Sequence, residues 1–279
     1  MEYRLLGSLQ IRACGDRRWR RVDGRAQRRL ISRLALHAGH VVSSDVLEED
    51  LEMSAGAVRT AVSRLRHVVD DDSVRTVPPG YVLEAAATDV DRFEWLVVRS
   101  SRLHRFEAAR FLDAALELWR GRPYDEFADE PWAIAEVARL SEMHREAREQ
   151  LADLWLVDGK HAAAMTLIEQ LLAEDPYRDR AHALLIRAHV LSGHRIEALH
   201  AFREYESQLA VEIGATPSAE LAALDRSITL ALATENGDVT PAVEAVEVIA
   251  AALADGPARG FAAQLVDAAE AERRRCPRR

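Results

Sequence analysis

Cationic and hydroxyl side chains recur along one face of a helix predicted between residues 54 and 69. At about 100° per residue, this face holds no carboxylate, and its members are Arg59, Thr60, Ser63, Arg64, Arg66 and His67. Arginine can donate two hydrogen bonds to a guanine edge, and hydroxyl groups can bond to bases or phosphates. The pattern therefore favours contact with a nucleic-acid groove. The alternative is an ordinary solvent-exposed helix face.

The flanking residues indicate what holds this helix in place. Its other face is an apolar stripe at helical spacing, made of Val58, Ala61, Val62, Leu65, Val68 and Val69. Upstream, Ser44 is expected to cap a shorter helix that ends near Leu51, followed by a tight turn. Downstream, Val74–Val77 and Tyr81–Leu83 alternate like strands around Pro78, Pro79 and Gly80. This layout predicts a helix-turn-helix with a wing.

Residues nearer the amino terminus extend the same domain. Short strand-like runs occupy Tyr3–Leu6, Leu9–Ala13 and Trp19–Val22, and Ala26–His37 has the pattern of an amphipathic helix. The order of strands, three helices and a hairpin predicts a winged helix-turn-helix domain over residues 1–88, with a small β-sheet and a wing.

From about Asp91 onward, the sequence is predicted to be almost entirely helical. Gly159 and Gly193 lie 34 residues apart, which is the tetratricopeptide period. Each is followed by matching apolar positions, namely Ala164, Ile168 and Leu171, then Ala198, Phe202 and Tyr205. We expect residues 93–119 and 131–156 to complete the stack, giving a mainly α chain with a tetratricopeptide-like second domain over 89–234. The alternative is a generic helical bundle.

Composition restricts the class of protein. The 279-residue chain is 48% hydrophobic and 30% charged, which predicts two domains with proper cores. Residues 1–88 carry a net charge of +2 and the remainder −11, so only the first domain suits DNA, and affinity from one copy should be weak and salt-sensitive. With no signal peptide and no apolar run of about 20 residues, we expect a cytoplasmic, nucleoid-associated protein without membrane contact.

Enzymatic and metal-binding functions find no support in the sequence. The phosphate-binding loop of ATPases, the Gly-x-Ser-x-Gly turn and the His-Glu-x-x-His motif are all missing. Cys14 and Cys276 lie at opposite ends of the chain without metal-like spacing, which predicts neither a disulfide framework nor a zinc site. The histidines at 182, 189, 194 and 200 are expected to lie on the surface or to pack between repeats. We therefore expect no catalytic residues, no cofactor and no metal.

Several motifs occur together along residues 1–232. Those of the first domain are Leu6-Gly7 with Leu9, Gln27-Arg28, Val41-Val42-Ser43, Ser63-Arg64-Leu65-Arg66 and Pro78-Pro79-Gly80-Tyr81. Those of the second are Asp91-Arg92-Phe93, Leu118-Trp119-Arg120-Gly121, Asp129-Glu130-Pro131-Trp132, Gly193 with Glu197-Ala198-Leu199, and Gly214 with Pro217. In this combination the chain resembles the Streptomyces antibiotic regulatory protein family, in which a winged helix precedes a bacterial transcriptional activator domain.

The resemblance implies an activator of pathway genes that binds double-stranded DNA at tandem direct repeats, as a homodimer or tandem assembly, and recruits RNA polymerase holoenzyme. It assigns groove and phosphate contacts to Arg59, Thr60, Ser63, Arg64 and Arg66, wing contacts to Arg75, Thr76 and Tyr81, and a flanking phosphate contact to Arg28. Other roles stay open: Arg64 could pair with a helix carboxylate, and Tyr81 could pack beneath the wing.

The chain departs from the family pattern between Leu51 and Ala57. Family members usually carry a tryptophan and a longer proline-containing loop there, which faces polymerase in related winged helices. We therefore hypothesise that this chain contacts polymerase differently, through the acidic cluster Glu48–Glu52 or through the second domain. The alternative function is a protein-interaction scaffold whose winged helix no longer binds DNA, which the short loop and low net charge would also fit.

Residues 235–279 lie beyond the resemblance and form a carboxy-terminal extension. Thr240–Ala254 and Phe261–Arg274 are predicted helices, and the arginine-rich end is predicted to be a disordered, solvated tail.

Overall fold

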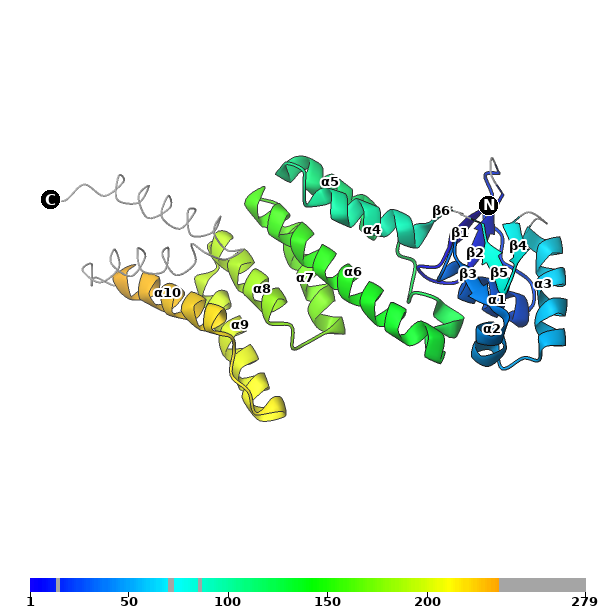
Figure 1. The fold of residues 1–279 in the computed structure, drawn as a ribbon. Helices are drawn as coiled ribbons and strands as arrows, with labels where there is room; N and C mark the ends of the chain where they lie inside the picture. Colours follow the sequence, from blue (N-terminus) through cyan, green and yellow to red (C-terminus); the bar gives the residue numbers. More distant parts are fainter. Residues whose placement is uncertain (14–15, 70–72, 85–86, 236–279) are drawn as a thin grey trace. The chain divides into compact units, whose positions relative to one another are not determined.

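The structure is a computed structural model that describes residues 1–13, 16–69, 73–84 and 87–235, with side chains through residue 229. The chain divides into two compact units, Met1–Leu154 and Trp155–Arg279. The helices predicted at Thr240–Ala254 and Phe261–Arg274 lie outside the described residues. Figure 1 shows the elements of each unit.

The first unit begins with a three-stranded sheet. Strands β1 (Glu2–Arg4), β2 (Gln10–Arg12) and β6 (Ala87–Thr88) form it in the order β2-β1-β6, with β2 antiparallel and β6 parallel to β1. The strand predicted at Trp19–Val22 is wrong, because only an isolated bridge joins Ile11 to Arg20. Gly24, at φ 80°, turns the chain into the next helix before a longer strand can form.

The wing belongs to a second sheet. Strands β3 (Val41–Ser43), β4 (Val74–Val77) and β5 (Gly80–Leu83) pair antiparallel in the order β3-β5-β4, which confirms the predicted hairpin and adds β3. Gly80 lies opposite Ser43, where a Cβ atom would stand 1.9 Å from the carbonyl oxygen of Val42. Only glycine allows the two backbones to approach this closely.

Three helices complete the winged helix: α1 (Arg25–Ala35), α2 (Ser44–Leu51) and α3 (Ala55–Val69). The apolar stripe of α3 is buried at Val58, Ala61, Val62, Leu65 and Val69 and half-buried at Val68, as its spacing predicted. The predicted cap Ser44 is wrong by one residue, because Ser43 caps α2 and accepts a hydrogen bond from the backbone N–H of Val46 at 3.3 Å. Ser43 has the extended backbone that a capping residue needs, since it ends β3.

The winged helix shares its core with the helices that follow it. These are α4 (Asp89–Ser100), α5 (Arg105–Leu116) and α6 (Pro131–Val157), and α4 begins with a capping box between Thr88 and Asp91. Phe93 on α4 lies in the same buried cluster as Leu34 and Leu65, and its ring meets Trp119 edge-on at 5.3 Å. The first unit therefore has one continuous apolar core.

The second unit is a set of paired helices. Its described elements are α7 (His161–Glu174), α8 (Asp179–Leu191), α9 (Arg195–Gln208), a π-helical turn at Leu209–Ile213 and α10 (Ala219–Glu235). Gly159 and Gly193 adopt φ values of 75° and 81°, so each glycine occupies the left-handed conformation that ends one helix before the next begins. The two sets of matching apolar side chains after these glycines are buried, as the 34-residue spacing predicted. A search of the described residues for a helix able to cross a membrane finds none.

Candidate nucleic-acid interface

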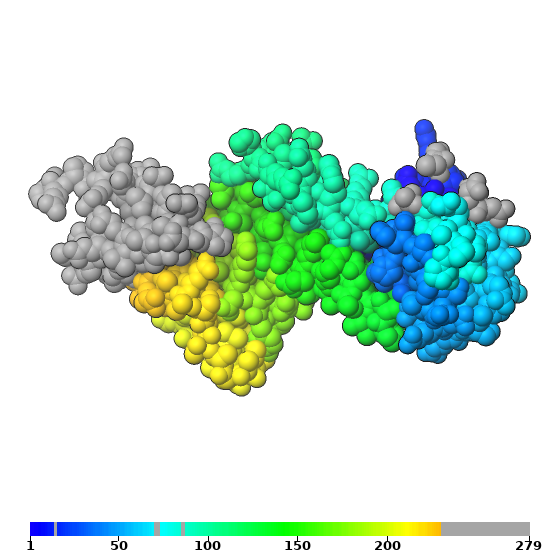
Figure 2. Space-filling view, viewed as in Figure 1, coloured from blue at the N-terminus to red at the C-terminus, as the bar shows by residue number. Residues whose placement is uncertain are grey.

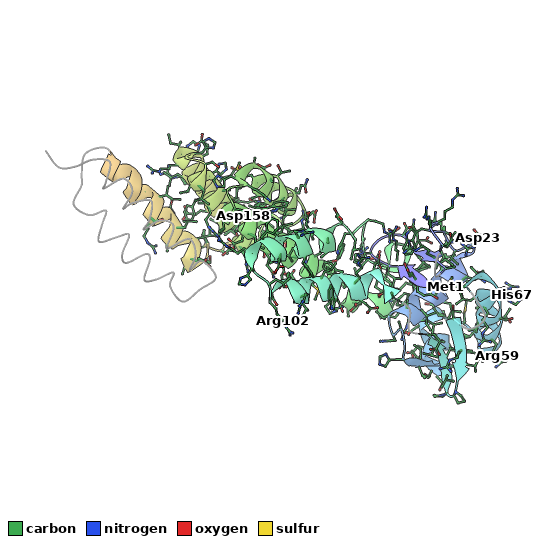
Figure 3. All side chains as sticks on the ribbon, turned by 90° about the horizontal axis from the view of Figure 1, so that it is seen from above. Met1, Asp23, Arg59, His67, Arg102 and Asp158 are labelled. Atoms are coloured by element: carbon green, nitrogen blue, oxygen red, sulfur yellow. The ribbon has the colours of Figure 1, made fainter. Side chains whose placement is uncertain are left out.

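The polar face of α3 is open to solvent. Arg59, Thr60, Ser63, Arg64 and His67 are exposed along it, and Figure 3 labels Arg59 and His67 on this outer helix. These five side chains follow the spacing i, i+1, i+4, i+5 and i+8, which places them on one side of an α-helix. The sequence interpretation of this face as solvent-accessible therefore agrees with the structure.

Arg59 and Arg64 are the two exposed arginines on this face of α3. Neither forms an ion pair with any residue in the described part of the chain, so the pairing of Arg64 with a helix carboxylate is not seen there. Thr60 donates its hydroxyl hydrogen to the carbonyl oxygen of Gly56 at 2.9 Å, which leaves its oxygen able to accept a further bond. Such a set of free guanidinium groups and hydroxyls is suited to phosphates and base edges.

Arg66 has a different role. Its Nε donates to the backbone oxygen of Val74 at 2.8 Å, and its Nη2 donates to the hydroxyl of Thr76 at 2.8 Å. Both acceptors lie on β4, so Arg66 fastens the wing to α3. We therefore interpret Arg66 as a positioning residue, with Thr76 as its partner.

We predict that Arg66→Ala loosens the wing. The substitution removes both hydrogen bonds and leaves the buried carbonyl of Val74 without this donor, so the free energy of unfolding should fall by about 1–2 kcal/mol. Hydrogen exchange at the amides of β4 should speed up, and Arg66→Lys should fail to restore it because lysine lacks the forked geometry. Unchanged exchange in β4 would show that other contacts hold the wing.

The remaining wing residues divide between surface and core. Arg75 pairs with Glu84 at an exposed position, where an ion pair adds little stability and can exchange for a phosphate. Tyr81 is only 7% exposed and belongs to the core, in line with the packing alternative. We therefore leave Tyr81 out of the proposed contact set.

Arg28 lies in an intramolecular ion pair. Its Nη2 is 2.7 Å from Oε2 of Glu126, and its Nη1 donates to the backbone oxygen of Val22 at 3.1 Å. Arg21 reaches the other oxygen of Glu126 at 2.9 Å. Hydrogen bonding to Arg28 is the main reason why the pKa of Glu126 lies below its usual value. The guanidinium of Arg28 is thus engaged inside the first unit, and its expected phosphate contact stays a prediction.

Asp89 anchors the first strand to α4, a contact that the sequence interpretation missed. Its carboxylate accepts hydrogen bonds from the backbone N–H groups of Leu5 at 2.6 Å and Leu6 at 3.2 Å. The guanidinium of Arg120 lies 3.4 Å away. Burial raises the pKa of Asp89, while the two N–H groups and Arg120 act in the opposite direction. The family motif that includes Arg120 was the one available signal.

Residues 120–130, here called the bridging segment, bind along the winged helix. The backbone N–H of Arg120 donates to Leu6 at 3.0 Å, and that of Tyr124 donates to Leu5 at 2.7 Å. Near the end of the segment, Glu130 forms an ion pair with Arg29 on α1. The segment that follows α5 therefore supports the elements that carry α3.

The turn between α2 and α3 is short, as the sequence indicated. Only residues 52–54 separate the two helices, and Glu52 adopts φ 53° to end α2. In the acidic cluster before it, Asp50 is paired with Arg33 at 2.6 Å, while Glu49 and Glu52 are exposed. Within the described ranges, no group of three or more potential ligands could hold a metal ion.

Comparisons with known proteins place this arrangement in a family. The family model described as "Bacterial transcriptional activator domain" matches residues 88–229. The chain is 30% identical to Regulatory protein AfsR of Streptomyces griseus over 214 residues, covering 72% of this chain and 22% of AfsR. It is 29% identical to Transcriptional regulatory protein EmbR of Mycobacterium tuberculosis, covering 82% of this chain and 63% of EmbR. It is 28% identical to Transcriptional regulator RedD of Streptomyces coelicolor, covering 70% and 61%.

A solved structure has the same fold. Mycobacterium tuberculosis EmbR, in complex with a low-affinity phosphopeptide, superposes with a TM-score of 0.75 at 24% identity over 96% of this chain and 70% of that one. The chain spans only about a fifth of AfsR and less than two thirds of EmbR or RedD. The matched domain, the relatives and the winged-helix fold together show that the chain belongs to the Streptomyces antibiotic regulatory protein family, with a bacterial transcriptional activator domain.

Proposed function

We propose that this chain regulates transcription by binding double-stranded DNA through α3 and the wing. The observation that carries the proposal is the exposed face of α3, on which Arg59 and Arg64 have no ion pair among the described residues while the opposite face is buried. In a helix-turn-helix protein, this is the face that enters the major groove. The naming of several relatives as transcriptional regulators supports the same function.

The contact set that we propose is smaller than the one predicted from sequence. Base-edge and phosphate contacts come from Arg59, Thr60, Ser63 and Arg64, and a wing phosphate contact comes from Arg75. Arg28, Arg66, Thr76 and Tyr81 hold the domain in shape. This set lies within residues 1–88, which we propose as the DNA-binding domain.

We further propose that the chain binds tandem direct repeats in pairs and activates transcription by recruiting RNA polymerase, acting in the cytoplasm on the nucleoid. Two copies side by side would offset the weak affinity expected of a domain with a net charge of only +2. The short turn at residues 52–54 leaves little loop for polymerase, whereas Glu49 and Glu52 are exposed beside it. We propose these carboxylates as a polymerase contact.

A binding titration tests the proposal. The purified chain is titrated with duplex DNA from upstream of its own and neighbouring genes, at two salt concentrations, beside duplexes of shuffled sequence. We expect at least one upstream duplex to bind about a thousandfold more tightly than its shuffled control, with affinity falling steeply as salt rises. Equal affinity for all duplexes would favour the scaffold alternative, in which the winged helix no longer selects DNA.

A further inference from the structure

The outer face of α4 combines apolar and cationic side chains that the rest of the unit leaves uncovered. Trp95 is 59% exposed and Val98 is 53% exposed. Arg92 and Arg99 are exposed one helical turn before and after Trp95, and Arg102 follows in the turn after the helix. This surface lies opposite the buried stripe of α4, and we call these five residues the α4 outer face.

Figure 2 and Figure 3 show where the helix that carries this surface lies. The space-filling view shows α4 and α5 at the surface, and Figure 3 labels Arg102 projecting from the end of α4. Phe111 on α5 lies against Trp95, with ring centroids 5.8 Å apart, so the indole is supported from one side and presents its remaining surface to solvent. A supported tryptophan loses little conformational entropy when a partner covers it.

On α4, carboxylates have intramolecular partners, whereas the exposed arginines form no ion pair with any residue that the structure describes. The carboxylate of Asp91 accepts hydrogen bonds from the backbone N–H and the hydroxyl of Thr88 within the capping box, and Glu94 forms an ion pair with Arg139 on α6. By contrast, Arg92, Arg99 and Arg102 make no ion pair with any residue that the structure describes. Asp91 and Glu94 on α4 thus have intramolecular partners, and the three guanidinium groups remain available to an external anion.

From this combination we propose that the α4 outer face binds an acidic amphipathic helix of a partner protein. Tryptophan and arginine are the residues most enriched where binding energy concentrates, and an apolar centre with a charged rim is the usual anatomy of a protein interface. The arginines would pair with carboxylates of the partner, while Trp95 and Val98 would cover its apolar residues. This binding is separate from the DNA contacts of α3 and does not depend on them.

Two other kinds of occupant fit the surface less well. Duplex DNA would use the arginines but gain nothing from exposed Trp95 and Val98, because phosphates offer no apolar surface. An anionic membrane would meet the net charge of −11 that residues 89–279 carry, which repels an extended negative surface. A short helix avoids that repulsion because it contacts only the local cations.

The test uses the full chain and a labelled synthetic peptide of about 18 residues. The peptide carries leucines at helical spacing on one face and glutamates on the other, and its affinity is measured by fluorescence anisotropy. Two controls are a scrambled peptide of the same composition and a peptide with lysine in place of glutamate. We expect the scrambled peptide to bind at least tenfold more weakly and the lysine peptide to show no saturable binding.

Variants of the full chain test whether the peptide binds at the α4 outer face. Trp95→Ala and the double variant Arg92→Glu, Arg99→Glu should each weaken peptide binding at least tenfold, with circular dichroism unchanged because these side chains are exposed. The double variant Arg17→Glu, Arg18→Glu makes the same charge change at exposed positions elsewhere in the unit and should bind normally. The proposal is overturned if the scrambled peptide binds equally well, if the control variant loses binding too, or if phosphatidylglycerol vesicles or duplex DNA bind this face in preference to the peptide.

Discussion

The double variant Arg59→Ala, Arg64→Ala is expected to bind its selected duplex about a hundredfold more weakly than the unaltered chain. Each arginine is exposed on α3 and forms no ion pair in the described part of the chain, so its guanidinium is available to DNA. A well-placed arginine contact contributes about 1–3 kcal/mol, and two contacts of about 1.4 kcal/mol each already give this loss. Stability should change little because neither side chain is buried.

The salt dependence of the same variant adds a second measurement. If both arginines contact phosphates, the slope of log affinity against log salt should become shallower by about 2, whereas base-edge contacts would leave the slope nearly unchanged and relax sequence preference. The double variant Arg105→Ala, Arg110→Ala, at exposed positions on α5, is the matched control and should bind normally. Equal affinity of the α3 variant and the unaltered chain would show that α3 is not the recognition helix.

Replacing Asp89 with alanine is expected to lower the free energy of unfolding of the first unit by about 4 kcal/mol. The substitution leaves the buried backbone N–H groups of Leu5 and Leu6 without their acceptor and leaves Arg120 without its carboxylate. Breaking a buried ion pair by removing one partner costs about 3–5 kcal/mol, and each orphaned donor adds its own desolvation cost. Urea-induced unfolding of the full chain, followed by tryptophan fluorescence, gives the value.

Asp113→Ala serves as the control for Asp89. Asp113 is exposed on α5, and its removal should change stability by less than about 0.5 kcal/mol. Asp89→Asn should fall between the two, because an amide oxygen can accept one of the two backbone bonds but carries no charge for Arg120. If Asp89→Ala were as stable as the control, the junction between β1 and α4 would have to be held by apolar packing alone.

The local elements could be predicted from sequence because their signals lie within a few residues. The stripe of α3 and the wing hairpin each give a pattern over a few turns or strands, and Gly159 and Gly193 each end a helix with a single left-handed residue. Strands β3 and β6 were missed because they are only three and two residues long and, unlike β1 and β2, do not lie within longer strand-like runs. The cap of α2 was assigned one residue late because two adjacent serines offer the same hydroxyl.

The candidate site was predictable as a face but not residue by residue. Spacing on α3 shows which side chains share a side, and this was enough for Arg59 and Arg64. It does not show that Arg66 turns toward β4, or that Arg28 meets Glu126, which lies 98 residues further along the chain. Arginine is long and flexible, so its partner depends on the tertiary fold, and local periodicity carries no information about it.

The bridging segment determines how much of the chain must stay together in a gene fusion or a truncated protein. The family model begins at residue 88, yet residues within it complete contacts of the winged helix: Asp89 and Arg120 bind the backbone of Leu5 and Leu6, and Glu126 pairs with Arg28 on α1. A gene fusion that moved residues 1–88 alone would transfer a winged helix with unsatisfied donors and an opened core. The shortest segment of this regulator that keeps these contacts of the winged helix therefore extends at least to Glu130.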